Sequence, residues 1–208
     1  MNLIDISRGF FSTAVYPGDP APTVTRLASF EDGDGYNLSA ITACVHTATH
    51  ADAPLHFFAD GAAVDELALR AFIGPCRVLE APPGVITGDA VDRRFPSDCS
   101  RLLIKGGGRA FFMDSAAQEL AARGLLLIGT DSLSVGCANN EAAPHKAFLQ
   151  NGVAILEGLD LTQVAPGDYF LFAPPIKLEG LEGAPVRAVL LDDPLLHDRS
   201  SRRNNPLR

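Results

Sequence analysis

The chain has 208 residues, of which 47% are apolar and 20% are charged, proportions typical of a globular protein rather than a disordered one. Its formal net charge of −8 argues against nucleic-acid binding, since phosphate recognition depends on clustered Lys and Arg. No apolar run approaches the roughly 20 residues that span a bilayer, and no signal peptide or membrane partner is expected.

The first third of the chain is predicted to be rich in β-strands. Residues 23–30 (TVTRLASF) and 36–46 (YNLSAITACVH) alternate between apolar and polar side chains and favour strands. The preceding stretch, YPGDPAP, is dense in turn-forming residues.

The middle of the chain alternates between helix and strand patterns, and we expect a helix followed by two strands at residues 64–72, 76–81 and 101–106. A further helix is expected over 114–124, with Asp114 as N-cap and Gly124 just beyond its end. The apolar run 125–131 reads as a strand buried on both faces. The order strand–helix–strand predicts a parallel pair with a right-handed crossover over 101–130.

The last third is predicted to begin with a helix over 144–152, with Pro144 in its first turn and Gly152 after its end. Three more strands are expected, at residues 153–158, 168–173 and 185–191. The sum is an α/β fold with a mixed β-sheet and flanking helices.

A single domain over residues 1–196 is expected, because this length suits one α/β domain and no repeat or linker is evident. Residues 197–208 are polar, and we expect a frayed tail with His197 solvated at its edge. The cysteines lie far apart without a CxxC pair, which favours reduced thiols in a cytoplasmic protein: Cys44, Cys76, Cys99 and Cys137.

One segment concentrates titratable side chains. HTATHADAPLH holds His46, His50, Asp52 and His56, which are separated by even numbers of residues and on a strand would all share one face. Pro54 and the small residues argue against a continuous element, so we expect a strand ending near His46 and a tight loop able to surround an ion.

Imidazole nitrogen and carboxylate oxygen are donors suited to Zn²⁺, and also to Mn²⁺ or Fe²⁺. The segment is not the HExxH pattern of helical zinc proteases, because Thr47 replaces the glutamate. A single histidine here would be explained by loop hydrogen bonds, but three with an aspartate favour a metal site.

A second pair of candidate ligands lies downstream. His145 falls in the expected helix, and Glu157 ends the following apolar strand, where a buried carboxylate must be paired or metal-bound. A helix advancing about 10 Å and a return strand spanning about 16 Å can bring the two together. From spacing alone, a helix-terminal histidine and a rim glutamate remain equally good explanations.

Other polar residues have simpler readings. Ser132 and Ser134 suggest a serine hydrolase, but no G-x-S-x-G elbow is present and a metal cluster makes a serine nucleophile unnecessary. Asp131 follows an apolar strand, where it can orient a ligand histidine or cap the following loop.

The segment HTATHADAPLH resembles the HxGTHxDxPxH motif of the metal-dependent cyclase family, which includes bacterial kynurenine formamidase and isatin hydrolase. Supporting similarity extends over nearly the whole chain, in YPGDP, LIGTDSLSV, HKAFLQNGVAILEGLDL and GDYFLFAPPIKLEGLEGAPVRAVLL. The resemblance implies a swivelling β/β/α-like fold and a homodimer or higher homo-oligomer.

The resemblance also implies residue roles. His46, His50 and Asp52 correspond to metal ligands, and His56 to the catalytic acid/base candidate. In formamidase-like members a downstream histidine and glutamate complete a second site, with the aspartate bridging. His145 and Glu157 match that pair in position and spacing.

Two positions depart from the family pattern. Ala48 replaces the usual glycine, so freedom at positive φ is lost. Tyr16 stands where kynurenine formamidases often carry tryptophan, and its ring is expected to stack on an aryl substrate. Phe57 or Phe58 could complete an apolar wall, although core packing is the preferred explanation for both.

The expected function is hydrolysis of an amide C–N bond by one or two divalent ions, most simply Zn²⁺ with Mn²⁺ as an alternative. His56 would carry a proton from the nucleophilic water to the leaving amine. The first substrate hypothesis is N-formylkynurenine, giving kynurenine and formate. The alternatives are hydrolysis of isatin or another cyclic amide or lactone, and a catalytically inactive metal-containing binding protein.

Overall fold

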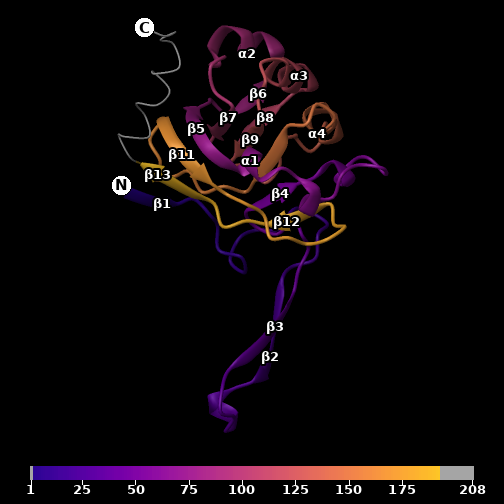
Figure 1. The fold of residues 1–208 in the computed structure, drawn as a ribbon, viewed down its shortest axis with the longest axis vertical. Coiled ribbons are helices and arrows are strands. Elements are labelled where there is room, and N and C mark those ends of the chain that lie inside the picture. Colours follow the sequence, from indigo (N-terminus) through magenta and orange to yellow (C-terminus); the bar gives the residue numbers. More distant parts are fainter. Residues whose placement is uncertain (1, 193–208) are drawn as a thin grey trace, which may run out of the picture.

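The computed structural model describes residues 2–192, and it folds as a curled mixed sheet with three of its four helices on one side and a long two-stranded arm (Figure 1). The tail prediction for 197–208, including His197, lies outside the described residues, and the domain boundary at residue 196 stays a prediction. Among the described residues, no helix is long and apolar enough to cross a bilayer.

The main sheet has nine strands in the order β1-β13-β11-β5-β7-β9-β10-β4-β12. The strands of this sheet that come first in the sequence are β1 (Asn2–Asp5), β4 (His50–Asp52), β5 (Ile73–Glu80) and β7 (Arg101–Lys105). The remaining strands are β9 (Leu127–Thr130), β10 (Ala154–Glu157), β11 (Gly167–Phe172), β12 (Gly183–Pro185) and β13 (Val189–Asp192). The four central strands β5, β7, β9 and β10 run parallel, and the flanking pairs are antiparallel.

Two small sheets accompany the main one. β2 (Thr23–Ala28) pairs with β3 (Leu38–Thr42), and β6 (Gly84–Ile86) pairs with β8 (Ala110–Phe112). The helices are α1 (Leu69–Phe72), α2 (Gly88–Arg94), α3 (Asp114–Ala122) and α4 (Ala142–Leu149). Single 3-10 turns occur at Phe30–Asp32, Pro54–His56 and Val64–Glu66.

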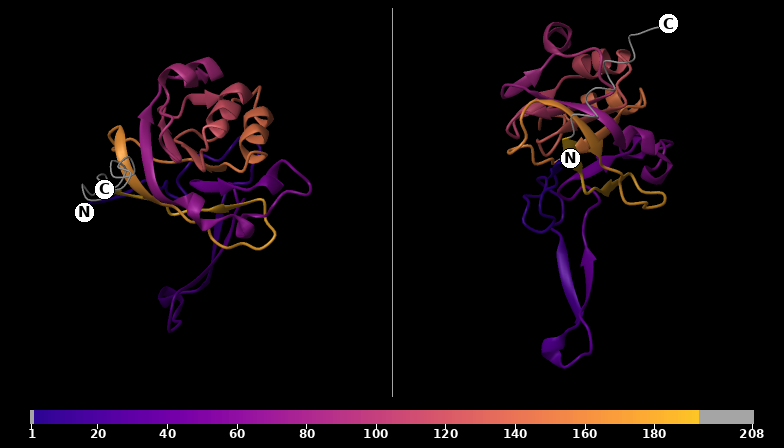
Figure 2. Two further views of the ribbon diagram at one scale, coloured as in Figure 1. Left: turned by 45° about the horizontal axis from the view of Figure 1, so that its top comes forward. Right: turned by 60° about the vertical axis from the view of Figure 1, so that its left-hand side comes forward.

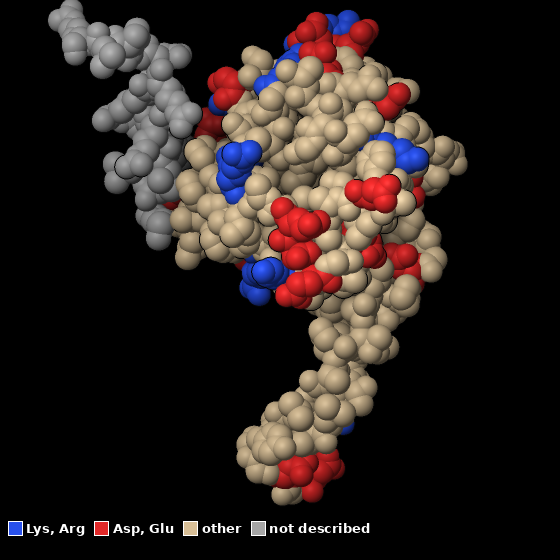
Figure 3. Space-filling view, turned by 45° about the vertical axis from the view of Figure 1, so that its right-hand side comes forward, with Lys and Arg blue, Asp and Glu red and all other residues tan. Residues whose placement is uncertain are grey.

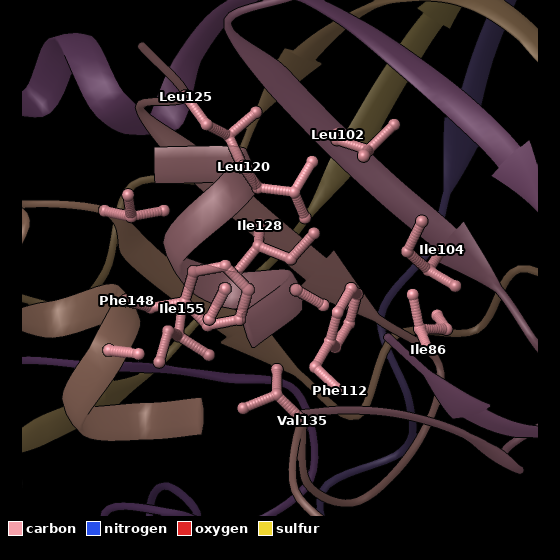
Figure 4. Packing of buried hydrophobic residues seen from close by; sticks show 14 of the residues in the cluster. Ile86, Leu102, Ile104, Phe112, Leu120, Leu125, Ile128, Val135, Phe148 and Ile155 are labelled. Atoms are coloured by element: carbon pink, nitrogen blue, oxygen red, sulfur yellow. The ribbon is translucent and has the colours of Figure 1, made fainter. Parts of the chain in front are cut away.

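The expected α/β fold with a mixed sheet is confirmed, and so is the parallel pairing expected over 101–130, which is that of β7 with β9. The apolar runs of these strands are buried on both faces, as alternate side chains show. On β7, Leu102 and Ile104 point into the cluster under α3 and α4, while Leu103 enters the cluster on the opposite face. Phe112 and Phe148 meet edge to face in the first cluster, with ring centroids 5.5 Å apart (Figure 4).

Several element predictions are wrong in detail. The helix expected over 64–72 breaks into a 3-10 turn and α1, because Leu67 and Ala68 have extended backbones. Asp114 is the first residue of α3 rather than its N-cap, which is Met113. The strand expected over 185–191 is divided between β12, which forms one edge of the main sheet, and β13, which is the second strand from the other edge.

The arm, defined here as residues 23–42, projects well away from the body (Figure 2). The six large apolar side chains on it are at least partly open to solvent: Val24, Leu27, Phe30, Tyr36, Leu38 and Ile41. The visible face of the arm carries few charges apart from an acidic tip (Figure 3). These exposed side chains have no covering surface within the described residues, and an isolated two-stranded hairpin is only marginally stable in water.

Candidate metal centre

The histidine segment begins in a turn rather than at a strand end. β3 stops at Thr42, and the strand in this region is β4, which starts at His50. The prediction of a strand ending near His46 is therefore wrong. The even spacing still matters on β4 itself, where His50 and Asp52 point to the same face.

Strand register brings Glu157 to the same face. β4 and β10 are antiparallel, with His50 opposite Glu157 and Asp52 opposite Ile155. Directly opposed residues of an antiparallel pair share a face, so the Glu157 carboxylate lies beside the His50 ring. The distance from His50 Nε2 to Glu157 Oε2 is 3.5 Å.

Helix α4 supplies the third element. After α4 the chain reverses at Gly152, which has a φ of 73°, and returns as β10. His145 Nε2 consequently lies 3.0 Å from Glu157 Oε1 and 3.5 Å from Asp52 Oδ2. The expected approach of His145 to Glu157 is therefore present in the structure.

The candidate metal centre comprises two overlapping groups that share Asp52. One contains His46, His50 and Asp52, and the other contains Asp52, His145 and Glu157; within each group the donor atoms lie within 4.8 Å of one another. Asp52 Oδ1 lies 2.9 Å from His46 Nδ1 and 3.3 Å from His50 Nε2. The predicted ligands thus meet in one place, with Asp52 between the two groups.

The hydrogen bonds of the rings show that this place suits a cation. His50 Nδ1 donates to the carbonyl of Ala48 at 3.0 Å, and His145 Nδ1 donates to the carbonyl of Glu141 at 2.7 Å. In the neutral tautomer these bonds fix, each Nε2 presents a lone pair to the Asp52 and Glu157 carboxylates. The Nε2 lone pairs and the carboxylate oxygens are all acceptors, so a proton or a metal ion must lie between them. These residues therefore fit a divalent cation.

Burial strengthens this conclusion, since His50, Asp52, His145 and Glu157 are all buried. Burial by itself would lower the pKa of His50, but hydrogen bonds and charge from Asp52 and Glu157 raise it to about 10. The pKa of His145 is likewise raised well above its usual value, against burial, by the charge of Glu157 and by contacts with Asp52.

The two carboxylates respond in the opposite sense. Burial would raise the pKa of Asp52, but hydrogen bonds from His145, His46 and His50 hold it well below its usual value. Burial and the charge of Asp52 raise the pKa of Glu157, yet His145 and His50 bring it below its usual value. Both are therefore carboxylates, as metal ligands must be.

His56 lies at the rim of this centre. Its ring centroid is 4.2 Å from that of His46 and 6.0 Å from that of His145. Partial burial of the ring, aided by His46 and His145, lowers the pKa of His56 below its usual value. The imidazole is therefore neutral near pH 7 and available to accept a proton.

Tyr16 is brought to the same region. Burial, a hydrogen bond to the Glu141 side chain and the charges of Glu141 and Glu157 raise the pKa of Tyr16 to about 12. Phe57 and Phe58 pack against the core cluster as partly buried residues, and the Phe57 ring centroid lies 4.7 Å from that of His145. Core packing thus accounts for much of the surface of both phenylalanines.

Ala48 has the left-handed backbone expected of the glycine it replaces. Its φ is 59°, and it is the only residue other than glycine with a positive φ between residues 2 and 192. This conformation turns its carbonyl toward His50 Nδ1. Ala48 therefore keeps the loop geometry at the expense of backbone strain.

Other predicted candidates have structural contacts. The Asp131 carboxylate accepts hydrogen bonds from the backbone N–H groups of Gly106, Gly107 and Gly108, so it caps a loop rather than orienting a ligand histidine. The Ser132 hydroxyl donates to the carbonyl of Ala110, and the Ser134 hydroxyl accepts from the N–H of Gly136.

Two acidic residues near the centre escaped sequence reasoning. Glu182 Oε1 lies 3.8 Å from His46 Nε2, because β12 pairs with β4 on the side away from β10. Glu141 precedes α4 and reaches the centre through its carbonyl. Neither belongs to a local motif, so only the long-range strand pairing or the helix position could have revealed them.

Comparisons with known proteins agree with this geometry. The family model described as "Putative cyclase" matches residues 4–136. The kynurenine formamidase of Salinibacter ruber is 38% identical over 93% of this chain and 99% of its own. A solved structure titled a potential metal-dependent hydrolase with cyclase activity is 29% identical, with a TM-score of 0.76 over 92% of this chain and 98% of its own.

Isatin hydrolase A from Ralstonia solanacearum shares the fold, with a TM-score of 0.78 at 19% identity over 92% of each chain. At that identity the likeness shows the fold alone. The resemblance inferred from the histidine motif is confirmed by these matches together.

Proposed function

The chain belongs to the cyclase family, and from this premise we propose that it is a metal-dependent amidohydrolase acting on carbon–nitrogen bonds other than peptide bonds. The proposed reaction is that of an arylformamidase, converting N-formylkynurenine and water to kynurenine and formate. The observation that carries it is the pair of histidine–carboxylate groups sharing Asp52, together with the similarity to a kynurenine formamidase over nearly the full chain.

We propose that one or two divalent ions are held by His46, His50, Asp52, His145 and Glu157. Zn²⁺ is the first choice of metal and Mn²⁺ is the alternative. A bound divalent ion lowers the pKa of water and polarises a carbonyl oxygen. The donor set of imidazole and carboxylate suits either metal.

The chain's own residues then handle the proton. A His56 ring nitrogen accepts the proton of the water that attacks the formyl carbon and delivers it to the aniline nitrogen as the C–N bond breaks. A neutral imidazole suits the first task, and the lowered pKa of His56 keeps the ring neutral near pH 7. Tyr16, with an edge of Phe57, would lie against the aryl ring of the substrate.

We further propose a homodimer in the cytoplasm. The exposed apolar side chains of the arm favour packing against a second copy of this chain. The arm extends away from the body and can therefore contact that second copy. The four cysteines are free, which suits a reducing compartment.

The test uses purified protein loaded with Zn²⁺ or Mn²⁺ and offered N-formylkynurenine and isatin. We expect formate release from the first, lost on chelation and in His56→Ala with its metal content kept. Faster turnover of isatin would favour the cyclic amide alternative. Stoichiometric metal without turnover of any amide or lactone would favour a metal-containing binding protein.

A further inference from the structure

The side chain of Thr49 joins three parts of the chain behind the candidate metal centre. It is 2% exposed. Its hydroxyl donates to the carbonyl of Gly158 at 2.6 Å and accepts from the backbone N–H of Arg8 at 2.9 Å. The hydroxyl therefore has both a donor and an acceptor role filled.

The position of this hydroxyl matters because of its neighbours in sequence. Thr49 precedes His50, and Gly158 follows Glu157, so the bond connects the residues adjacent to two opposed candidate ligands. The β4–β10 pairing ends with His50 opposite Glu157. The Thr49 hydroxyl thus closes the strand pair one residue beyond its last backbone partners.

The surrounding backbone leaves little freedom at this point. Gly158 donates its N–H to the carbonyl of Ser132 at 2.9 Å, and the carbonyl of Thr49 accepts from the N–H of Val186 at 2.9 Å. A β-carbon at Gly158 would lie 2.2 Å from the carbonyl oxygen of Ala48. That same carbonyl holds the His50 ring.

Arg8 reinforces the junction from the N-terminal segment. Its guanidinium donates to the carbonyls of Leu159 and Asp131, at 3.1 and 2.6 Å. The hydroxyl of Thr49 is the side-chain group that connects this segment to the β4 ligands and to the strand that carries Glu157.

We propose that Thr49 is a positioning residue that sets the separation between the His50 and Glu157 ligand atoms. Without its hydroxyl the direct bond between the ends of β4 and β10 is lost. The two ends are then held only through their separate bonds to Val186 and Ser132, which allows His50 and Glu157 to move apart. The proposal rests on the metal site of the proposed function, and it adds a residue that contacts no ion.

The test compares Thr49→Val, which keeps the shape but loses the hydroxyl, with Thr49→Ser, which keeps the hydroxyl. Zn²⁺ affinity is measured for the purified full chain by competition with a chromophoric chelator. Groups that orient metal ligands typically change affinity 10- to 100-fold. We expect about that loss for T49V and a change under about threefold for T49S. Thr49→Ala repeats the loss of the hydroxyl if T49V is insoluble.

Val91→Ala is the control for general destabilisation, because Val91 is fully buried in α2. A lower melting temperature with unchanged Zn²⁺ affinity is expected for this variant. Equal affinity in T49V and the unmodified protein, or the same loss in V91A, would overturn the positioning role alone. If the unmodified protein binds no divalent ion, the proposed function fails and the role of Thr49 fails with it.

Discussion

His145 Nε2 lies 3.0 Å from Glu157 Oε1, although the two residues belong to different elements joined by a reversal of the chain. The contact follows from α4 leading directly into β10. It places a histidine from a helix and a carboxylate from the sheet beside Asp52. The second ligand group therefore depends on one local helix–strand unit meeting the distant strand β4.

Removing the charge of Glu157 should weaken metal binding by the group that contains Asp52, His145 and Glu157. In Glu157→Gln the side chain keeps its shape but becomes a poor metal ligand. We expect the metal content after dialysis to fall by one ion per chain, and kcat to fall about 100-fold or more, since outer partners alone change activity 10- to 100-fold. Elemental analysis and formate release measure the two effects.

Glu182→Gln serves as the matched control, because Glu182 is near His46 but partly exposed. It should keep its metal content. An unchanged metal content in E157Q would show that Glu157 is not a ligand.

Metal binding should release protons. The pKa of His50 is raised to about 10 and that of His145 is also raised, so in the metal-free protein both are protonated at pH 7. A metal needs the deprotonated rings, and apparent affinity should therefore increase as pH rises from 6 to 8. The apparent metal affinity should rise about tenfold per pH unit for each proton released.

Calorimetric titration with Zn²⁺ in buffers of different ionisation enthalpy measures the number of protons. We expect at least one at pH 7. An affinity independent of pH, with no proton released, would contradict the raised pKa of both histidines.

Residue 48 should tolerate glycine and reject branched side chains. Ala48 has a φ of 59°, a region that costs about 1–2 kcal/mol for a residue with a β-carbon. Ala48→Gly removes that strain but adds freedom to the unfolded chain, so its stability should stay within about 1 kcal/mol of the original. Ala48→Val should lower the free energy of unfolding by more than about 2 kcal/mol.

Urea unfolding of the metal-free proteins compares the three residues at this position. Equal stability of A48V and A48G would mean that the loop does not hold the left-handed conformation in solution.

The arm should control assembly. Val24 and Ile41 face each other across β2 and β3 and are 58% and 60% exposed. Val24→Asp combined with Ile41→Asp should convert a dimer to a monomer, because charge in an apolar interface is not compensated. Analytical ultracentrifugation measures the mass.

Val85→Asp is the control for the arm variant, because Val85 is 53% exposed on the body, in β6. It should stay dimeric. A dimer that survives the double substitution would place the interface elsewhere.

Local patterns predicted the elements with clear signals. The apolar runs of β7, β9 and β10 and the small-residue helix α3 are where the sequence indicates them. The short elements β1, β6 and β8 were missed because three or four residues carry little periodic signal. The sequence does not reveal the division of 185–191, because Pro185 ends β12 and Arg187 is the only polar residue before the apolar pattern continues.

The candidate site was predictable in its residues but not in its arrangement. Side-chain chemistry singles out the histidine segment, and spacing allows His145 and Glu157 to approach each other. The placement of His50 opposite Glu157 depends on strand register, and the approach of Glu182 depends on a strand at the other end of the chain. No local rule specifies either.

The position of β4 between β10 and β12 has a consequence for how the protein is made. His50 and Asp52 leave the ribosome early, but their strand finds its first neighbour only when residues 154–157 emerge and its second when residues 183–185 follow. Until then this short segment has no sheet to join. Assembly of the centre is therefore a late event of biosynthesis, and a chain truncated before β10 would leave the histidine segment without its sheet.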